Sequence, residues 1–485
     1  MKIPKEVQSV VLELEKKGFE AYVVGGCVRD ILLGRVPEDW DIATNATPEE
    51  IQSVFSKTFY ENKFFTVTVL TGSQDASVKE IEVTTFRSDS RYTDRRRPEE
   101  VRYAETIEED LSRRDFTVNA IALKLAKKKE EFIDPFEGKK DLKAEVIRAV
   151  GKPEERFAED ALRMMRAIRF SSTLGFDIGK ETREAILANS MYIKDISQER
   201  IRDEFEKIIL SDRAYEGIEA LRELNMLKYI VPELQEGYGV TQNKHHIYTV
   251  WEHNLYSLQY AVKQKWSLEV RLASLFHDIA KPRVKRGEGQ DATFHGHEVM
   301  GEKMAEKILS RMKFKNSVIE KVSLLVRYHM FYYNVDEVTA SSVRRLLANV
   351  GLENIEDLLQ VRMADRMGSG VAKAEPYKLR HLRYIIDKVS KDPISPKMLK
   401  MNGNDLIKLL GIEPGPRVGW ILSILLQEVL EDPSKNTQEI LEARAKELAQ
   451  LSQEELEKMA KAAKKEKEKV ENREDEMTKQ KYWVN

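Results

Sequence analysis

The chain has one cysteine among its 485 residues, Cys27, so it cannot form a disulfide bond within itself. It also lacks an apolar run of the roughly 18–20 residues that a membrane-spanning helix needs. Residues 1–18 carry charges every few positions, which predicts a short amphipathic helix rather than a signal peptide. These absences favour a cytoplasmic protein without a membrane partner.

A strong net charge is absent as well, because 80 Lys and Arg residues balance 82 Asp and Glu residues. A neutral total leaves nucleic acid binding open, since a local basic surface is enough for it. The apolar content of 41% is sufficient for ordinary hydrophobic cores. A length of 485 residues predicts about three domains at roughly 150 residues each.

Strand patterns are concentrated in the first 150 residues. Short runs rich in β-branched and apolar residues occupy 21–24, 41–44, 65–70 and 79–87. Residues 88–101 are charged and show no regular period, which predicts an exposed loop. The sequence therefore predicts a sheet with helices in this part of the chain.

The character of the chain changes near Pro153, a residue well suited to begin a helix. From there to about Pro433 the apolar residues recur at helical spacing, and most histidines fall between His245 and His329. From Ser434 the chain is rich in Glu, Lys and Ala, which predicts a helix that frays into a solvated tail.

Two short motifs in the first part suit phosphate and metal chemistry. Asp39 and Asp41 flank Trp40 at the start of a predicted strand, so both carboxylates can face one site. Two carboxylates on one face suit hard divalent cations, although such a pair alone is more often a solvated turn. Upstream, Gly25-Gly26 ends a strand and precedes Arg29, which can bind phosphate oxygens.

Together with further motifs in the same order, these residues resemble the class II tRNA nucleotidyltransferase and bacterial poly(A) polymerase family. The motifs are Gly25-Gly26-Cys27-Val28-Arg29-Asp30, Asp39-Trp40-Asp41, Glu82-Val83-Thr84-Thr85-Phe86-Arg87, Arg113-Arg114-Asp115-Phe116-Thr117-Val118-Asn119-Ala120 and Glu159-Asp160-Ala161-Leu162-Arg163-Met164-Met165-Arg166. The resemblance implies addition of CCA to the 3′ end of tRNA from CTP and ATP, with Mg²⁺. Addition of A alone and poly(A) synthesis remain alternatives, because these activities share the motifs.

The resemblance also implies roles for individual residues in the head. Asp39 and Asp41 correspond to the catalytic metal ligands, and Gly26 and Arg29 to triphosphate contacts. Of the Arg-Arg-Asp motif, we expect Arg114 rather than Arg113 to contact the nucleotide. Glu82 could supply a third carboxylate near the metals or lie on the solvent face of its strand, and the sequence leaves both open.

Nucleotide choice is expected on the helix from Pro153. Asp160 and Arg163 are three residues apart and would share one helical face, where they can pair with a base edge. In the family this pair selects CTP and ATP over GTP and UTP. Arg166 can share the nucleotide, whereas Arg169 would lie nearly opposite Asp160 and is assigned to the nucleotide on resemblance alone.

Residues 88–98 resemble the flexible loop of the family members that add the terminal A, which disfavours an enzyme that adds only CC. A second set of residues resembles the HD phosphohydrolase superfamily and predicts a divalent metal site. Its members are His253, His277, Asp278, His297, His329 and Asp365. His295 lies outside this metal signature, and His245 and His246 are left unassigned.

The resemblances imply an α+β chain with a nucleotidyltransferase head followed by an all-α neck, body, HD segment and tail. The expected domains are the head at 1–150, the RNA- and nucleotide-binding neck and body at 151–240, the HD domain at 241–375 and the tail at 376–485. Two rival functions remain: a metal-dependent hydrolase whose head only binds RNA, and a non-catalytic RNA-binding protein.

Overall fold

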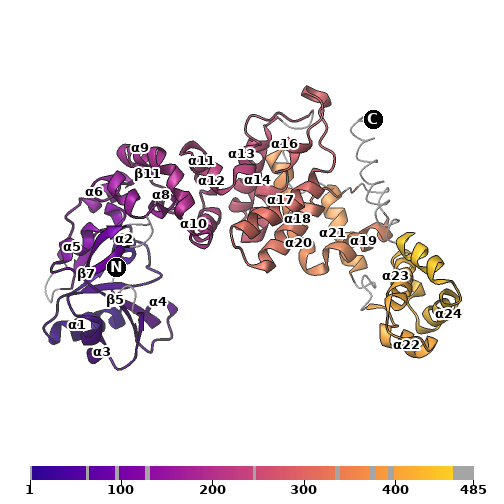
Figure 1. Cartoon of the computed structure of the whole chain (residues 1–485), viewed down its shortest axis with the longest axis horizontal. Helices are drawn as coiled ribbons and strands as arrows, with labels where there is room; N and C mark the ends of the chain where they lie inside the picture. The colour runs from indigo at the N-terminus through magenta and orange to yellow at the C-terminus, as the bar shows by residue number, and fades with distance from the viewer. Residues whose placement is uncertain are drawn as a thin grey trace. The chain divides into compact units, whose positions relative to one another are not determined.

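The computed structural model describes residues 3–61, 65–92, 98–125, 131–243, 247–331, 333, 339–370, 377–390 and 398–462. The chain forms two compact units, Met1–Pro232 and Glu233–Asn485, here called unit 1 and unit 2 (Figure 1). Among the helices of the described ranges, none is long and apolar enough to cross a membrane.

Unit 1 is built on a seven-stranded sheet with the order β3-β4-β5-β2-β1-β8-β9. Its strands are β1 (Ala21–Val24), β2 (Asp41–Thr44), β3 (Thr58–Glu61), β4 (Thr66–Leu70), β5 (Glu80–Thr85), β8 (Ala122–Lys124) and β9 (Glu131–Ile133). Strands β2 and β5 are parallel, while the other neighbouring pairs are antiparallel. All four residues of β1 are buried, as expected for the centre of a sheet. The predicted mixed sheet and α+β class are confirmed.

Helices accompany this sheet along the chain. They are α1 (Lys5–Lys16), α2 (Gly26–Leu32), α3 (Pro48–Val54), α4 (Ala76–Lys79), α5 (Ile107–Ser112), η1 (Thr117–Asn119) and α6 (Gly138–Ala144). The predicted N-terminal amphipathic helix is α1, which buries Val7, Val10, Val11 and Leu14. These positions recur at three and four residues, so a single face of α1 is covered.

The prediction of an exposed loop at 88–101 is wrong for the described residues 88–92 and 98–101. Strands β6 (Arg87–Tyr92) and β7 (Pro98–Tyr103) form an antiparallel hairpin, with Arg87 opposite Tyr103. The two strands pair through backbone groups, which does not require an alternating apolar face. The charged sequence therefore gave no sign of strands here. The tip of the predicted flexible loop, residues 93–97, lies outside the described residues.

The predicted helix from Pro153 is present, but its continuation through Asp160 is wrong. Helix α7 (Pro153–Glu159) ends before Asp160, whose backbone is extended with φ −142° and ψ 106°, and α8 (Leu162–Leu174) begins two residues later. The Asp160 carboxylate accepts a hydrogen bond from the backbone N–H of Leu162 at 3.0 Å. Aspartate often makes such local bonds at helix starts, and here they compete with a continuous helix.

The remainder of unit 1 is mostly helical. It contains β10 (Val146–Ile147), β11 (Asp177–Ile178), α9 (Lys180–Asn189), η2 (Ser190–Asp195), α10 (Gln198–Leu210), α11 (Ala214–Glu223) and α12 (Leu227–Ile230), while α13 (Pro232–Gln235) spans the boundary between the units. Helix α8 packs against both α10 and α11. Gly217 on α11 permits this approach, because a Cβ there would lie 2.5 Å from side-chain atoms of Ile208 and Ser172.

The regular elements of unit 2 in its described ranges are helices, apart from one isolated bridge between Arg286 and Thr293. Its elements are α14 (Val250–Lys263), α15 (Leu268–Phe276), α16 (Lys281–Val284), η3 (Gly289–Asp291), α17 (His297–Arg311), α18 (Asn316–Tyr328), α19 (Ala340–Val350), α20 (Leu352–Gly368), α21 (Tyr377–Val389), α22 (Gly403–Leu410), α23 (Pro416–Glu431), η5 (Pro433–Lys435) and α24 (Gln438–Ala449). Helix α14 packs on α15 and α20, and α17 on α18. A Cβ at Gly368 would lie 2.1 Å from Ser257 Oγ, so this glycine lets α20 approach α14 closely.

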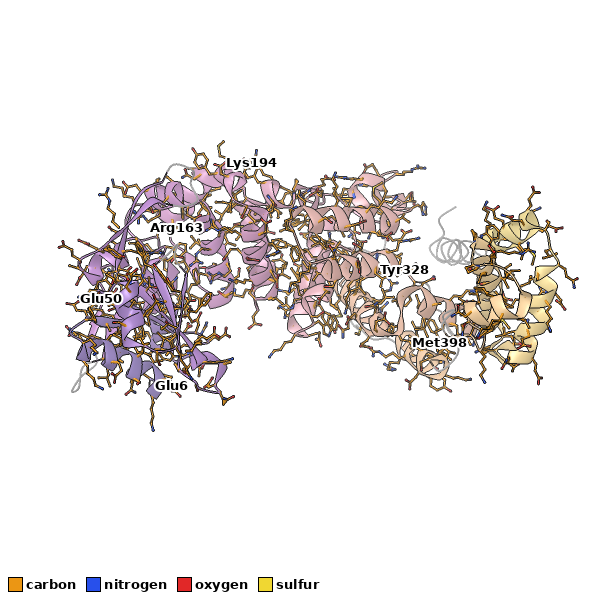
Figure 2. All side chains as sticks on the ribbon, turned by 60° about the horizontal axis from the view of Figure 1, so that its bottom comes forward. Glu6, Glu50, Arg163, Lys194, Tyr328 and Met398 are labelled. Atoms are coloured by element: carbon orange, nitrogen blue, oxygen red, sulfur yellow. The ribbon has the colours of Figure 1, made fainter. Side chains whose placement is uncertain are left out.

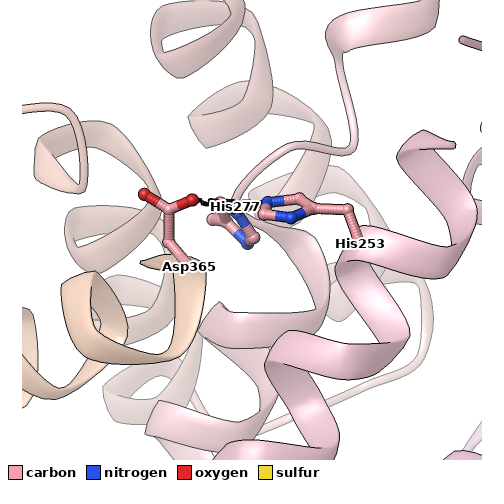
Figure 3. Close-up of side chains that lie close together, drawn as sticks. All are labelled: His253, His277 and Asp365. Carbon is pink, nitrogen blue, oxygen red and sulfur yellow. Dashed lines mark hydrogen bonds and ion pairs between the residues drawn. The ribbon is translucent and has the colours of Figure 1, made fainter. Parts of the chain in front are cut away.

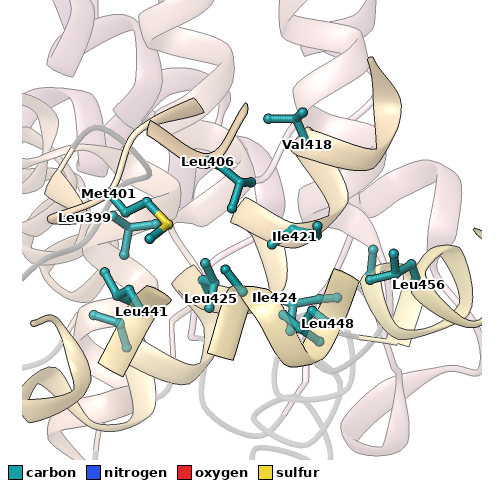
Figure 4. Packing of buried hydrophobic residues seen from close by; sticks show 13 residues of the cluster. Leu399, Met401, Leu406, Val418, Ile421, Ile424, Leu425, Leu441, Leu448 and Leu456 are labelled. Atoms are coloured by element: carbon teal, nitrogen blue, oxygen red, sulfur yellow. The ribbon is translucent and has the colours of Figure 1, made fainter. Parts of the chain in front are cut away.

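The last described helices enclose a hydrophobic cluster of their own, shown in Figure 4. Leu406 of α22, Ile421 and Leu425 of α23, and Leu441 and Leu448 of α24 are all buried there. This packing stabilises the helices predicted near the C-terminus. The charged tail from residue 463 onward, predicted to fray, lies outside the described residues.

Candidate active site

The turn after β1 brings the phosphate-binding motif and the metal motif together. Gly25 has φ +79°, and a Cβ at this position would lie 2.9 Å from Arg114 Nη1 and 3.4 Å from Asp41 Oδ2. Both the positive φ and the lack of space favour glycine. Next in the chain, Gly26 begins α2, and the guanidinium of Arg29 lies 3.7 Å from where its Cβ would be.

The carboxylates lie at the start of β2. Asp41 pairs with Val24 across the antiparallel ladder and with Glu82 across the parallel one. Directly paired residues share a face of the sheet, so Glu82 lies on the same side as Asp41. Trp40 is buried while Asp39 is exposed, as the alternation of an extended segment predicts.

The electrostatics of Asp41 suit a cation site. Burial raises the pKa of Asp41 to about 6, and the neighbouring charges of Asp39 and Glu82 act in the same direction against the opposing guanidinium of Arg114. Burial and mutual repulsion make it unfavourable for these carboxylates to be ionised together, and a bound cation would relieve both effects. The donor set therefore fits Mg²⁺, which commonly takes one or two carboxylates and completes its shell with phosphate oxygens and water.

Arg114 and Arg113 both bind one buried carboxylate, Asp110. Asp110 accepts hydrogen bonds from Arg113 Nη2 at 2.7 Å and from Arg114 Nη2 at 3.1 Å. Burial alone raises the pKa of Asp110, but the two guanidinium groups reverse the effect and lower it. Arg114 is thus held beside Gly25 and Asp41, as expected for a nucleotide contact. Arg113 also donates to the carbonyl of Arg87, at the base of the hairpin.

Three arginines surround the ring of Phe170 on α8. The guanidinium carbons of Arg29 and Arg166 lie 5.4 Å from the ring centroid, and that of Arg169 lies 3.5 Å from it. Such cation–π contacts hold guanidinium groups without consuming their N–H donors. Arg169 therefore lies near Arg29 and Arg166. The expectation that Arg169 lies nearly opposite Asp160 assumed one continuous helix, and the helix is broken at Asp160. Its role in binding nucleotide stays a prediction.

Two carboxylates hold Arg166 and Arg169 in place, and the sequence interpretation assigned a role to neither of them. Arg166 donates to Asp115 at 2.7 Å, and Arg169 donates to Glu204 of α10 at 3.0 Å. Burial by itself raises the pKa of Asp115, but Arg166 and Arg163 overcome that and lower it to about 2. Asp115 belongs to the Arg-Arg-Asp motif, so its position was visible in the sequence. Glu204 carried no comparable signal.

The two residues expected to read the base bind different partners. Arg163, labelled in Figure 2, donates to Glu159 at 2.6 Å and to the carbonyl of Arg113 at 3.0 Å. Asp160 is bound by Arg200 of α10 through both carboxylate oxygens. The backbone N–H of Arg163 donates to the Asp160 carbonyl, which keeps the two residues adjacent.

A second candidate site lies in unit 2, where the six residues expected from the resemblance to the HD superfamily come together and are buried. Their ligand atoms form two compact groups, each with atoms within 4.8 Å of one another: His253 with His277 and Asp365 (Figure 3), and Asp278 with His297 and His329. Within the described residues these are the two groups that meet this criterion, and the carboxylates of the head are not among them. His295 is exposed, while His245 and His246 lie outside the described residues.

Hydrogen bonding fixes the direction in which three of these histidines face. The Nδ1 atoms of His277, His297 and His329 lie 2.7–2.8 Å from backbone carbonyl oxygens three residues earlier. A carbonyl only accepts, so each neutral ring carries its proton on Nδ1 and presents the Nε2 lone pair to the cluster. The Nε2 atoms of His297 and His329 face each other at 3.3 Å.

The charges of the cluster are arranged for a cation. Burial lowers the pKa of His253, but the Asp278 and Asp365 carboxylates raise it to about 9. Burial likewise lowers the pKa of His329, and its neighbouring histidines keep it low, at about 4, against the opposing effect of Asp278. Carboxylates that raise the pKa of a buried imidazole in this way also attract a metal cation. The donor set fits a transition-metal ion.

Comparisons with known proteins match this architecture. Three family models match: "Poly A polymerase head domain" at residues 21–148, "Probable RNA and SrmB-binding site of polymerase A" at 175–237, and "tRNA nucleotidyltransferase domain 2 putative" at 296–445. A CCA-adding enzyme from Leuconostoc mesenteroides is 33% identical over 450 residues, with 91% of this chain and 96% of that protein covered. One from Ligilactobacillus salivarius is 35% identical over 456 residues, with 92% and 98% covered.

The solved structures agree with the sequence comparisons. The Bacillus stearothermophilus CCA-adding enzyme in complex with CTP aligns with a TM-score of 0.67 and 29% identity over 92% of this chain and 98% of that one. The Thermotoga maritima enzyme complexed with tRNA shares the fold at a TM-score of 0.54 and 21% identity, over 92% and 96% of the two chains. With relatives of this identity matched over nearly their whole length, the chain belongs to the CCA-adding enzyme family and is a tRNA nucleotidyltransferase.

Proposed function

We propose that this enzyme adds CCA to the 3′ end of tRNA, taking CTP and ATP as substrates. The observation that carries the proposal is the convergence of Gly25, Asp41 and Arg114 where the central strand β1 ends and its neighbour β2 begins, a place where a triphosphate can meet a cation site. Relatives matched over nearly their whole length are CCA-adding enzymes, and solved structures of such enzymes contain CTP, ATP or tRNA.

In this proposal each group has a separate task. Asp39 and Asp41 hold Mg²⁺, which when bound neutralises the triphosphate and lowers the pKa of the attacking 3′ hydroxyl. The backbone at Gly26 and the guanidinium groups of Arg29 and Arg114 orient the phosphates for in-line attack. Glu82, which shares a sheet face with Asp41, adds negative charge that favours the cation.

Selection of the nucleotide is assigned to Asp160 and Arg163, with Arg166 and Arg169 beside them. Cytosine and adenine present an exocyclic amino group where uracil and guanine present a carbonyl oxygen. A carboxylate accepts a hydrogen bond from that amino group and has no donor for a carbonyl. Addition of the terminal A is supported by the resemblance of residues 88–98 to the flexible loop of relatives that add it.

The proposal is tested by incubating the protein with Mg²⁺, each labelled nucleotide and tRNA that lacks CCA. We expect incorporation from CTP and ATP and little from UTP or GTP. Binding of tRNA without incorporation would instead support the alternative in which the head only binds RNA. An Asp41→Asn variant provides the matched inactive control, because it keeps the size of the side chain and removes its charge.

A second activity is favoured by the cluster in unit 2. The Nε2 atoms of His297 and His329 face each other at 3.3 Å, which is unfavourable for two lone pairs unless a cation or a proton lies between them. We infer that the six HD residues hold a divalent metal, which when bound would acidify a water for hydrolysis of a phosphomonoester or phosphodiester. Lys281, buried and 2.5 Å from Asp278, adds positive charge that would favour a phosphate.

This second proposal requires two assays on the same protein. We expect hydrolysis of a cyclic nucleotide or a model phosphodiester with Mn²⁺ or Ni²⁺, and its loss in His277→Ala. CCA addition at saturating tRNA should persist in that variant, because the two sites use different residues and different ligand types. A wild-type protein that binds no metal after exposure to these ions would contradict the proposed site.

A further inference from the structure

Asp160 is bound by a residue that none of the motifs assigns. Arg200 of α10 donates from Nη2 to Asp160 Oδ2 at 2.7 Å and from Nη1 to Asp160 Oδ1 at 3.3 Å. The two side chains are 40 positions apart in the sequence, and both are partly buried. Two parallel bonds between a guanidinium group and a carboxylate fix the plane of the carboxylate as well as its position.

The hydrogen bonds of Asp160 leave one acceptor site open. A carboxylate offers about four lone-pair positions, two on each oxygen. Oδ1 accepts from Arg200 and from the backbone N–H of Leu162, whereas Oδ2 accepts from Arg200 alone among the described residues. The remaining position on Oδ2 can take one N–H donor without displacing any of these bonds.

The described backbone around Asp160 gives its carboxylate one hydrogen bond, so a residue from another element is needed to hold it in place. Asp160 lies between α7 and α8 with an extended backbone, so no regular helix holds it. Its proposed partner in base recognition, Arg163, is bound by Glu159 and the carbonyl of Arg113. Arg200 comes from α10, which packs along α8, and is therefore anchored to the same helix that carries Arg163.

We propose that Arg200 is a positioning residue for nucleotide selection, which directs the one open acceptor of Asp160 toward the amino group of cytosine or adenine. The inference rests on the proposed role of Asp160. We therefore expect the Arg200 guanidinium to stay bound to Asp160 while Asp160 contacts the base of the nucleotide. A carboxylate released from Arg200 could rotate, and rotation would let it bind through water or other donors and so tolerate uracil and guanine.

The test measures kcat/KM for all four nucleotides on tRNA that lacks the terminal nucleotides. Arg200→Ala should reduce the preference for CTP over UTP, and for ATP over GTP, by about tenfold or more, the discrimination that one paired base contact provides. Arg200→Lys keeps the charge without the two-point contact and should give an intermediate preference. The control Arg202→Ala, on the same helix and paired with the adjacent Asp203, should keep the wild-type preference.

A purely structural role would give a different pattern. If Arg200 only tied α10 to the α7–α8 junction, Arg200→Ala would lower the melting temperature and slow all four nucleotides equally. Such a result, or an unchanged preference in both Arg200→Ala and Arg200→Lys, would overturn the inference. Arg200→Lys also provides the answer if the alanine variant does not fold.

Two further variants separate this inference from the proposed function. Asp160→Ala should itself relax the preference, and Arg200→Ala in that background should relax it no further, because both act through one carboxylate. A wild-type protein without nucleotide preference would refute the proposed function. A relaxed Asp160→Ala combined with a fully selective Arg200→Ala would refute the role of Arg200 alone.

Discussion

Replacing Gly25 by alanine separates the geometry of the nucleotide site from the stability of the fold. At φ +79°, alanine adds strain of about 1–3 kcal/mol. The new Cβ would lie 2.9 Å from Arg114 Nη1, an atom at the end of a flexible side chain. The guanidinium group can move away, so the protein should fold while the arginine leaves its position beside Asp41.

The loss of a charge-assisted hydrogen bond to the triphosphate costs about 1.5–3 kcal/mol. We therefore expect kcat/KM for CTP to fall by about tenfold to a hundredfold in Gly25→Ala. Gly34→Ala is the matched control, because Gly34 has φ +71° and nothing within 4 Å of its Cβ position. Its positive φ should also lower the stability, but the variant should keep its activity.

The assay is steady-state addition of labelled CTP, with thermal melting of each variant recorded in parallel. Equal losses of activity in Gly25→Ala and Gly34→Ala would refute the reasoning, since backbone strain would then explain both. A Gly25→Ala variant with wild-type kcat/KM would show that Arg114 does not contact the triphosphate from its position beside this turn.

Three other predictions concern the charged groups. Asp39→Ala or Asp41→Ala should abolish addition and leave tRNA binding intact by gel shift, and addition within about tenfold of wild type would contradict their role as metal ligands. The pKa of Asp115 is depressed from 3.8 to about 2, so its pairing stabilises the fold above pH 3.8 and is lost as the pH falls through 2. Acid unfolding followed by circular dichroism should show a loss of about 2 kcal/mol over that window, absent in Asp115→Asn. His277→Ala should bind less Mn²⁺ than wild type by equilibrium dialysis, and equal binding would argue against the site in unit 2.

Much of the head could be predicted because its signals are local. The apolar run of β1, the glycine turn after it and the alternation around Trp40 each depend on neighbours in the sequence. The hairpin β6–β7 could not be predicted in this way, because backbone pairing leaves no apolar period in charged residues.

The partners of the site residues were harder to predict. The spacing predicted a continuous helix, which Asp160 interrupts, and its carboxylate accepts a hydrogen bond from the first residue of the following helix. Arg200 and Glu204 contact residues 40 and 35 positions away, and nothing near them in the sequence indicates those contacts. The Nδ1 bonds that turn the histidines of unit 2 inward depend on helix geometry, whereas the order of these residues in the chain was enough to predict that they lie together.

The most direct test of the central claim is a comparison of three tRNA substrates that end before CCA, after the first C and after the second C. Each is incubated with CTP and ATP together and with each nucleotide alone, and the products are resolved at single-nucleotide length. We expect the first substrate to gain C, C and A and then stop, and the third to gain a single A from ATP. Extension of the third substrate alone would identify an A-adding enzyme, long runs of A would identify a poly(A) polymerase, and either result would contradict the proposed CCA addition.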